Sequence, residues 1–430
     1  MNDVTSLPPS LWADTAPPSR SHPALQESVS TGVVVIGGGF TGLAATLSLA
    51  ERGISTVLVE AHEIGWGASG RNGGQVIPGL KYDPDELLSR YGKEHGQRMI
   101  DISGRNADVV FELIRRHNID CDAHQKGWIQ PAFNAASLRV VEARAKQWED
   151  QGVPVRWLDR AECTKRLGSE AYVGGWLDPR AGGLNPLAYV RGLANAAEAA
   201  GATLHERSSV TAIRQSAGKW QVEVATGGRL VCDQVLLCTN GYTTDLQEGL
   251  ERSVIAANSY QIATRPLTEE EGKDILPGGE VASDARKLLL YFRRDASGRF
   301  LIGGRGPFHD PRGDQDFSHL RRAMTKLYPA LMGVEVTHQW AGRVALTRDM
   351  LPHVHQPAEG LTVALGYNGR GVGMGTHLGK LIGESLGQNR LEETLPFPIT
   401  PIRPIPFHGL QRLYVGTAVN YFRFKDWLDR

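Results

Sequence analysis

Three glycines at a fixed spacing, followed by one carboxylate, are the first residues that could do chemistry. Gly37, Gly39 and Gly42 form a G-x-G-x-x-G pattern directly after the apolar run 33–36, and Glu60 follows 18 residues after Gly42. The first glycine permits a tight turn, the second lets backbone approach a pyrophosphate, and the third lets a helix pack closely on a sheet. The helix start offers amides to phosphates, and the acid can bind an unphosphorylated ribose. The pattern predicts a dinucleotide site for FAD or NAD; a glycine-rich turn without a ligand is the alternative.

A second glycine-rich segment decides between these two dinucleotides. Residues 65–75 read GWGASGRNGGQ, with serine, arginine, asparagine and glutamine between the glycines. Such a loop exposes consecutive amides together with hydroxyl, guanidinium and carboxamide groups. These groups suit a long ligand that runs from a pyrophosphate through a ribityl chain to a flavin ring. The segment therefore favours FAD; a mobile surface loop is the alternative.

This loop, placed directly after a βαβ unit, resembles that of the D-amino-acid oxidase superfamily of flavoproteins, which includes glycine oxidase and sarcosine oxidase. The resemblance is strongest to the branch of the γ-glutamylputrescine oxidoreductases and their bacterial neighbours, which share the loop, a Pro-rich arm ending in His22-Pro-Ala-Leu, and this chain length. It covers nearly the whole sequence and is more specific for the cofactor than for the substrate. Segments 208–213, 238–242 and 366–373 match further parts of the pattern, which place a valine against adenine, close the nucleotide site and direct a helix start at the flavin.

The glycine patterns and the resemblance together imply a set of residues that contact FAD. They are Gly37, Gly39, Phe40, Thr41, Gly42, Glu60, Ala61, Gly67, Ala68, Ser69, Arg71, Asn72, Gly73, Gly74, Gln75, Val210, Thr239, Asn240, Gly241, Gly342, Arg343, Asn368, Gly369, Arg370, Gly371 and Val372.

The cysteines bear on how the flavin is held. Relatives of the sarcosine oxidase type bind flavin covalently through a cysteine just after the segment that matches 339–343, and the corresponding stretch 344–352 contains none. We therefore expect non-covalent FAD. The four cysteines have no CxxC spacing and no neighbouring histidine cluster, so we expect buried thiols and no metal site.

Flavin chemistry at a carbon–nitrogen bond asks little of the protein. The C–H must lie over the flavin, the nitrogen must be neutral, and the reduced flavin must be stabilised. The missing catalytic triad is thus no argument against an FAD-dependent enzyme acting on CH–NH or CH–NH2 donors. The candidate catalytic residues are Gln75 and Arg343 beside the ring, and Tyr260, Tyr291 and Arg293 on strands expected to face it.

The two arginines among these candidates each have an alternative interpretation. Arg293 could clamp a carboxylate bidentately, or it could be a solvated side chain beside Arg294. Arg343 could bind flavin or substrate, or it could form a structural ion pair. His338 and His377 are interpreted as packing residues.

The resemblance implies a small amine substrate of the γ-glutamylputrescine type, oxidised to an imine that hydrolyses to an aldehyde, with oxygen as the acceptor giving hydrogen peroxide. The alternatives are an oxidase or dehydrogenase of a secondary, cyclic or D-amino acid such as sarcosine or pipecolate, and a flavin-binding protein without turnover. Some relatives promote the oxygen reaction with a lysine near the strand matching 300–303. Here the nearest basic residues are Arg299 and Arg305, which leaves oxidase and dehydrogenase both open.

Regular elements must position these residues. Apolar periodicity, caps and turns predict strands at 31–36 and 56–60 around a helix at 41–52, helices at 83–116, 135–151, 186–200, 318–327 and up to 386, a β-meander at 203–214, 219–226 and 229–238, and strands at 258–265, 287–294 and 299–304.

The fold class that follows is α/β: a Rossmann-like FAD-binding domain interleaved with an α+β substrate domain that carries a mainly antiparallel sheet. The FAD-binding domain takes 31–80, 186–250 and 336–390, and the substrate domain takes 81–185 and 251–335. Residues 1–30 form a surface arm, and 391–430 form a tail whose last segment, 413–428, is expected to cover the substrate domain.

Composition excludes other classes. Lys plus Arg and Asp plus Glu each number 47, which gives no electrostatic reason to expect nucleic acid or an anionic membrane as partner. No run of 18 apolar residues and no secretory signal occurs, so we expect a cytoplasmic protein. The expected partners are a small amine and oxygen or another electron acceptor; the oligomeric state stays open.

Overall fold

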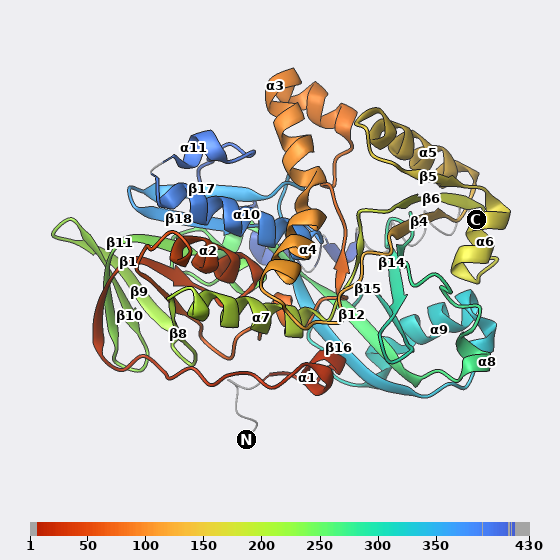
Figure 1. Ribbon diagram of the computed structural model, residues 1–430, viewed down its shortest axis with the longest axis horizontal. Coiled ribbons are helices and arrows are strands. Elements are labelled where there is room, and N and C mark those ends of the chain that lie inside the picture. Colours follow the sequence, from red (N-terminus) through yellow and green to blue (C-terminus); the bar gives the residue numbers. More distant parts are fainter. Residues whose placement is uncertain (1–6, 389, 412, 414, 418–430) are drawn as a thin grey trace.

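Two sheets, built from interleaved segments, make up the framework of the molecule (Figure 1). The computed structural model describes residues 7–388, 390–411, 413 and 415–417 of the 430-residue chain. The predicted amphipathic segment 413–428 therefore lies almost wholly outside the described residues. The helices are α1 (Leu11–Thr15), α2 (Phe40–Ala50), α3 (Pro84–Gly104), α4 (Asn106–Arg116), α5 (Ala135–Asp150), α6 (Arg160–Leu167), α7 (Pro186–Ala199), α8 (Glu269–Gly272), α9 (Ser318–Leu327), α10 (Gly371–Leu386) and α11 (Leu391–Thr394).

The first sheet has a parallel centre in the order β18, β11, β1, β2, β8, with β17 antiparallel at one edge and the β9–β10 hairpin joined to β11. Its strands are β1 (Ser28–Ile36), β2 (Thr56–Val59), β8 (Thr203–His205), β9 (Val210–Ser216), β10 (Lys219–Val224), β11 (Arg229–Leu237), β17 (His353–Ala358) and β18 (Leu361–Leu365). The residues Val33–Ile36 are buried, as expected for a central parallel strand covered on both faces.

The second sheet is mainly antiparallel and has the order β16, β12, β15, β14, β13, β4, β6, β5. Its strands are β4 (Trp128–Ala132), β5 (Arg156–Leu158), β6 (Gly174–Asp178), β12 (Ile255–Pro266), β13 (Val281–Ser283), β14 (Leu290–Arg294), β15 (Arg299–Arg305) and β16 (Val336–Leu346). Two short strands, β3 (Gln75–Val76) and β7 (Gly182–Gly183), pair with each other. The predicted fold class, an α/β cofactor unit interleaved with an antiparallel unit, is confirmed.

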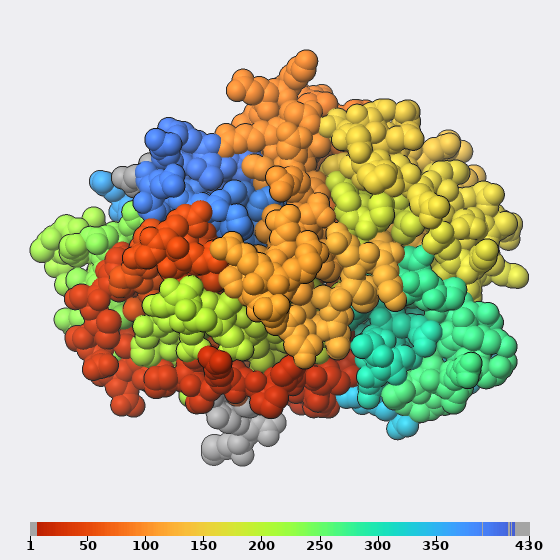
Figure 2. Space-filling model, viewed as in Figure 1, coloured from red at the N-terminus to blue at the C-terminus, as the bar shows by residue number. Residues whose placement is uncertain are grey.

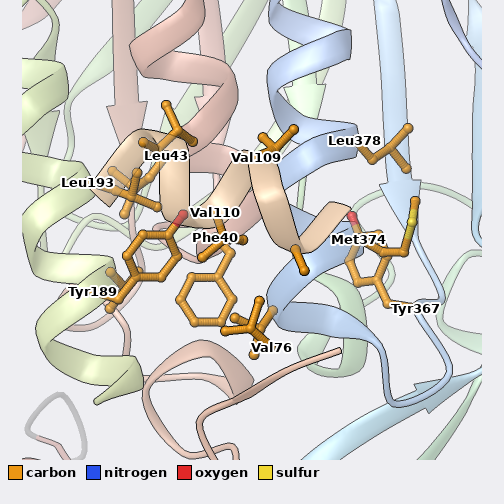
Figure 3. Close-up of a cluster of buried hydrophobic side chains, with 14 of the residues drawn as sticks. Phe40, Leu43, Val76, Val109, Val110, Tyr189, Leu193, Tyr367, Met374 and Leu378 are labelled. Atoms are coloured by element: carbon orange, nitrogen blue, oxygen red, sulfur yellow. The ribbon is translucent and has the colours of Figure 1, made fainter. Parts of the chain in front are cut away.

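Helices α2, α7 and α10 lie across the first sheet and share one core (Figure 1). Figure 3 shows Phe40 and Leu43 of α2 among Tyr189 and Leu193 of α7, with Leu378 of α10 nearby. The backbones of α2 and α10 touch: a Cβ at Gly379 would overlap the carbonyl oxygen of Thr41. This close approach fixes where α10 begins relative to the G-x-G-x-x-G turn.

The structure corrects two predicted elements and bears on one domain boundary. The stretch 203–214 is two strands, because Thr203–His205 pairs in parallel with β2 before the chain turns into β9. The helical stretch 83–116 is divided into α3 and α4, with a kink at Gly92 (φ 77°). The segment 336–346 pairs with β12 and so belongs to the second sheet, and we propose to begin the last cofactor-domain segment after it.

The N-terminal arm is also more than a surface strap. It contains α1, and the Leu11 and Trp12 side chains of that helix are almost fully buried. Within the described part of the chain, no helix is both long enough and apolar enough to cross a membrane. The cytoplasmic location stays a prediction.

Candidate active site

A cavity of about 760 Å³ lies between the two sheets. Its wall combines the ends of β1, β2 and β11, the loop 66–75, the start of α10, and residues of β12, β14, β15 and β16. It therefore runs from the dinucleotide turn to the second sheet. Its volume is in the range of cofactor and ligand pockets.

The dinucleotide turn forms one end of this cavity. Gly37 has a φ of +112°, which favours glycine, and a Cβ there would lie 2.9 Å from the carbonyl oxygen of Cys238. Gly39 is the N-cap of α2, and the amide of Phe40 donates to the Ser69 hydroxyl at 3.0 Å. Gly42 lies behind the turn, where a Cβ would overlap the Gly37 carbonyl oxygen. The glycines therefore keep Cβ atoms away from the turn that would approach phosphates, and the Ser69 hydroxyl lies beside the first helical amide.

Glu60 occupies the place expected of a ribose-binding acid. Its Oε2 accepts the Gly38 amide at 2.6 Å, and its Oε1 accepts the His62 amide at 3.0 Å. Burial raises the pKa of this carboxyl, and the two amides oppose that shift. Each carboxylate oxygen keeps a lone pair for a ribose hydroxyl, so the residue fits the adenosine part of FAD.

Most of the predicted cofactor residues line the cavity. Those in the wall are Gly37, Gly39, Phe40, Thr41, Glu60, Ala61, Gly67, Ala68, Ser69, Arg71, Asn72, Gly73, Gln75, Val210, Thr239, Asn240, Gly342, Arg343, Asn368, Gly369, Arg370, Gly371 and Val372. Gly42 and Gly74 lie behind the wall, and Gly241 lines a smaller neighbouring cavity of about 290 Å³. These three glycines shape the site without facing its main cavity.

The start of α10 closes the cavity near the glycine-rich loop. Residues 367–372 line it, and the first amides of an α-helix have no partner within the helix. Asn368 braces this turn, because its Oδ1 accepts the Thr347 amide at 2.9 Å and its Nδ2 donates to the Gly366 carbonyl at 2.6 Å. The arrangement presents a partial positive charge to a ligand that is rich in acceptors.

Asn72 and Arg71 use their side chains inside the loop. The Asn72 Nδ2 donates to the Ser69 carbonyl at 2.7 Å, and its Oδ1 accepts the Gly74 amide at 2.8 Å. The Asn72 carboxamide, one of the predicted FAD contacts, therefore stiffens the loop, and the residue lines the cavity. The Arg71 guanidinium lies 4.6 Å from the Trp66 ring and 4.9 Å from the Tyr242 ring, and burial lowers its pKa.

Arg343 lines both cavities and forms an ion pair at its exposed end. Its Nη2 lies 3.5 Å from Asp310, whose side chain is 73% exposed, and its guanidinium lies 5.2 Å from the Tyr242 ring. Such exposed pairs contribute little to stability. From this one position Arg343 forms the ion pair and also reaches the cavity, so both predicted roles remain compatible with the structure.

The second sheet supplies the opposite wall through alternate residues. Ser259 and Gln261 of β12 line the cavity, and so does Tyr291 of β14, whose hydroxyl lies 2.8 Å from the Ser259 hydroxyl. Tyr260 points to the other face of the sheet, because neighbouring residues of a strand alternate. It packs against Phe317 and donates to the His309 carbonyl at 2.6 Å. The prediction that Tyr260 faces the flavin is therefore wrong.

Arg293 lies behind the glycine-rich loop and not in the cavity wall. Its side chain is only 3% exposed, its Nη2 donates to the Leu184 carbonyl at 2.7 Å, and its guanidinium lies 5.3 Å from the Trp12 ring. Burial lowers its pKa to about 10. Both predicted positions, a clamp facing the substrate and a solvated side chain beside Arg294, are wrong.

Gln75 lines the cavity, and its side-chain amide nitrogen is already hydrogen-bonded. Its Nε2 donates to the carbonyls of Ala282 and Phe292 at 2.9 and 3.2 Å. These two bonds tie the end of the glycine-rich loop to the second sheet. The side-chain oxygen is left as an acceptor.

Lys81 and Arg305 are basic residues of the wall that the sequence did not assign to the site. Lys81 is open to the cavity, and burial together with the nearby Arg370, Arg144 and Arg305 lowers its pKa to about 7. Burial also lowers the pKa of Arg305. Among the described residues neither side chain has an ion pair or a hydrogen bond. No local motif marks either position, since only the tertiary fold brings them to the cavity.

Such a cavity, with a dinucleotide turn at one end and a polar sheet at the other, defines a flavin-dependent oxidoreductase. Residues 32–385 match the family model described as FAD dependent oxidoreductase (DAO). The chain belongs to this DAO family, and FAD is its cofactor. Because the cysteine nearest the cavity, Cys238, lies beside Gly37 at the dinucleotide end, non-covalent binding stays the expectation.

Individual relatives agree with this membership. The chain is 34% identical over 385 residues to a probable oxidoreductase OrdL of Rhizobium meliloti, covering 88% of each chain. It is 30% identical over 430 residues to the γ-glutamylputrescine oxidoreductase of Escherichia coli, covering 99% of this chain and 100% of that one. The glycine oxidase structure of Geobacillus kaustophilus superposes with a TM-score of 0.70 at 23% identity, over 88% of this chain and 99% of that one, which supports the fold.

Proposed function

We propose that this protein oxidises a carbon–nitrogen bond of a small amine that also carries a carboxylate, of the γ-glutamylputrescine type. The observation that carries the proposal is the unpaired cationic wall formed by Lys81 and Arg305. Within the described residues the one acid of the cavity wall is Glu60, and it lies at the dinucleotide end. The relative named γ-glutamylputrescine oxidoreductase, 30% identical over the full chain, supports the same substrate class.

The charges of this wall select between amines. Arg305 and Lys81 repel each other and have no acid to neutralise them, so a substrate carboxylate is the complement that the site lacks. Arg305 is assigned as its partner, because guanidinium binds carboxylate bidentately. A diamine such as putrescine, which carries two positive charges and no carboxylate, meets only repulsion here.

The same positive potential favours the reactive form of the amine. Bound FAD supplies the acceptor for a hydride, and that transfer requires a neutral substrate nitrogen. Cations nearby lower the pKa of an ammonium group, because they disfavour its charged form. The Gln75 side-chain oxygen, held by the bonds of its Nε2, can then accept the N–H of the amine and orient it. Tyr291 covers the same wall and stays a proposed substrate contact.

The imine product would hydrolyse to an aldehyde, and oxygen as acceptor would give hydrogen peroxide. A relative named glycine oxidase, 25% identical over 382 residues, supports an oxygen-dependent reaction. The alternative substrates, a secondary, cyclic or D-amino acid, also bring a carboxylate to Arg305, and they differ in the distance between carboxylate and amine.

Anaerobic reduction of the purified holoenzyme tests the proposal. We expect γ-glutamylputrescine to bleach the flavin absorbance, with putrescine inactive at equal concentration and sarcosine, pipecolate and D-alanine slower. Admission of air should restore the colour within the turnover time if oxygen is the acceptor. Reduction by putrescine at the same rate would refute the carboxylate requirement. Bleaching by dithionite and by no amine would refute the function.

A variant pair examines the assigned carboxylate partner. Arg305→Gln should raise the KM for γ-glutamylputrescine by about tenfold to a hundredfold, since hydrogen bonds to charged groups are worth about 1.5–3 kcal/mol. The matched control is Arg299→Gln on the same strand, whose amide and guanidinium both interact with Asp295 outside the cavity. Equal effects of the two substitutions would contradict the assignment.

A further inference from the structure

Two consecutive carbonyl groups of the cofactor loop are held by indole N–H groups. The Trp340 Nε1 donates to the Arg71 carbonyl at 3.0 Å, and the Gln261 Nε2 donates to the same oxygen at 2.6 Å. The Trp12 Nε1 donates to the Asn72 carbonyl at 2.8 Å. Both carbonyls are thereby turned toward protein donors and away from the ligand.

This anchoring determines where the next two amides point. In a trans peptide the N–H and the C=O point in opposite directions, so a fixed carbonyl fixes the amide that shares its plane. The amides concerned are those of Asn72 and Gly73, and both residues line the cavity. In the described part of the chain neither amide has an acceptor, while the neighbouring amides of Arg71 and Gly74 bond to Ala68 and Asn72.

The amides of Asn72 and Gly73 lie in half-buried residues of the cavity wall and are free to donate to a ligand. A flavin ring is rich in carbonyl and nitrogen acceptors and can accept both hydrogen bonds. The amides are also preorganised, because they need no rotation when a ligand binds or when its charge changes.

The indole of Trp12 comes from the N-terminal arm, outside both sheets. In Figure 2 the arm runs along the lower edge of the molecule and reaches the second-sheet unit. Ser10 caps α1 by accepting the Ala13 amide at 3.1 Å. The Trp12 ring is 1% exposed and lies edge-on to the Trp340 ring, with 5.9 Å between centres. The two indoles therefore form one clamp.

We propose that Trp12 and Trp340 are positioning residues that hold the amides of Asn72 and Gly73 toward the flavin. The N-terminal arm is thereby part of the cofactor site. The inference depends on the FAD cofactor and not on the identity of the amine.

The test removes one indole N–H and leaves a smaller aromatic ring in its place. Trp12→Phe in the full-length protein should raise the FAD dissociation constant about fivefold to tenfold, as expected for one net hydrogen bond of about 1 kcal/mol. The flavin midpoint potential should move to more negative values, because a misaligned amide stabilises the reduced flavin less well. Flavin fluorescence on titration and equilibration with reference dyes measure the two quantities.

The matched control is Trp220→Phe. Its Nε1 also donates to a backbone carbonyl, that of Glu359 at 3.1 Å, but in the first sheet away from the cavity. We expect this variant to keep wild-type FAD affinity and potential. A Trp12→Phe protein that loses thermal stability and keeps both flavin properties would overturn the proposal, since the residue would then be structural only.

A second variant keeps the test decisive if Trp12→Phe fails to fold. Trp340→Phe examines the same clamp through the Arg71 carbonyl, and its effect on the potential should have the same sign. With both single variants folded, the double variant should change the potential by less than the sum, because the two residues act on one loop. Because Gln261 still holds the Arg71 carbonyl, the Trp340→Phe effect should be the smaller of the two. An effect of the opposite sign in Trp340→Phe, or strictly additive effects, would contradict the clamp.

Discussion

At the scale of single residues, the site was predictable where local geometry decides and unpredictable where the fold decides. The glycines of the G-x-G-x-x-G turn and Glu60 lie where the sequence placed them, because turn, helix start and strand end follow one another within a few residues. Tyr260 and Arg293 were predicted in the wrong places. The face of the sheet on which a strand residue lies, and the loop that covers it, depend on partners far along the chain. Arg305 reaches the cavity only through the pairing of β15 in the second sheet.

Glu60→Gln examines the adenosine end of the site. The variant keeps one acceptor oxygen but directs an amide group toward the Gly38 or the His62 N–H, which are both donors. The loss of charge-assisted hydrogen bonds to the ribose and the turn should weaken FAD binding about tenfold to a hundredfold. Titration of apoprotein with FAD measures it. Wild-type affinity in this variant would show that the acid does not bind the ribose.

The free energy of unfolding of a Lys81→Met variant tests whether the charge of Lys81 destabilises the folded protein. The folded-state pKa of Lys81, about 7, is lower than its ordinary value of 10.5. The charged side chain therefore destabilises the fold fully below pH 7, and the penalty disappears as pH rises toward 10.5. Lys81→Met should stabilise the apoprotein by about 1 kcal/mol at pH 6, a small value because the side chain is open to water in the cavity.

Denaturant unfolding of the apoprotein from pH 6 to pH 10 measures how this gain in stability depends on pH. The difference between Lys81→Met and wild type should shrink above pH 7 and vanish near pH 10.5. Lys93→Met, at an exposed position of α3, is the control and should show no such trend. A gain that grows with pH would contradict the lowered pKa of Lys81.

At the scale of elements, strands and helices that carry a cap, a turn or apolar periodicity in the sequence were confirmed. The boundaries predicted between adjacent elements were not. The helix after Asn185-Pro186 begins as predicted, with Asn185 accepting the Ala188 amide at 3.1 Å. The stretch 203–214 carries no turn signal as clear as those of the hairpin that follows, and it divides because Thr203–His205 completes the parallel sheet. Likewise 336–346 joins the second sheet by pairing with β12, a long-range choice that composition does not encode.

The packing of α10 on α2 yields a prediction about elements. Gly379 allows the two backbones to touch at Thr41, and Gly383 does so at Ala45. Gly379→Ala forces the helices apart and should destabilise the holoenzyme by about 1–3 kcal/mol, the usual cost of overpacking. Since α10 begins at the cavity, FAD affinity should fall in parallel. Gly313→Ala, where a Cβ meets nothing within 4 Å, is the control.

Calorimetry and FAD titration of the two glycine variants separate the outcomes. A Gly379→Ala protein with reduced stability and wild-type FAD affinity would show that the start of α10 holds its place independently of this contact.

At the scale of the whole molecule, the site exists because several distant segments meet between two sheets. The cavity takes residues from segments 36–81, 208–210 and 238–246, and from the strands and the helix start between 258 and 372. The resemblance anticipated this interleaving, and composition alone gave only the expectation of two domains. The arm was predicted as a surface strap, because a short Pro-rich segment carries no sign of the pocket that buries Trp12.

The last prediction concerns how the arm is fastened to the body. His22 of the arm is 3% exposed; its Nε2 lies 3.3 Å from Glu198 and its Nδ1 lies 3.6 Å from Glu206. The neighbouring Glu206 carboxylate raises the pKa of His22 against the effect of burial, and the Glu206 pKa is lowered, with burial opposing and His22 the largest favourable cause. The same carboxylate lies 3.8 Å from Arg207, which also donates to the His22 carbonyl at 2.9 Å.

The sign of the pH dependence follows from these two shifts. The raised pKa of His22 contributes stability fully below its ordinary value of 6.5, and this is lost as pH rises through the folded-state value. The lowered pKa of Glu206 contributes stability above its ordinary value of 4.5, and this is lost as pH falls. His22→Gln should therefore cost most between about pH 4.5 and 6.5, roughly 1–3 kcal/mol for a buried pair, and progressively less as pH rises through the folded-state pKa of His22. Thermal unfolding against pH measures this difference in stability between the variant and the wild type.

His353→Gln is the control. It removes a surface pair with the half-exposed Asp349 and should cost less than about 0.5 kcal/mol. A cost for His22→Gln that is constant across pH would mean that the arm is held by packing and by Arg207, with no contribution from the charge of His22.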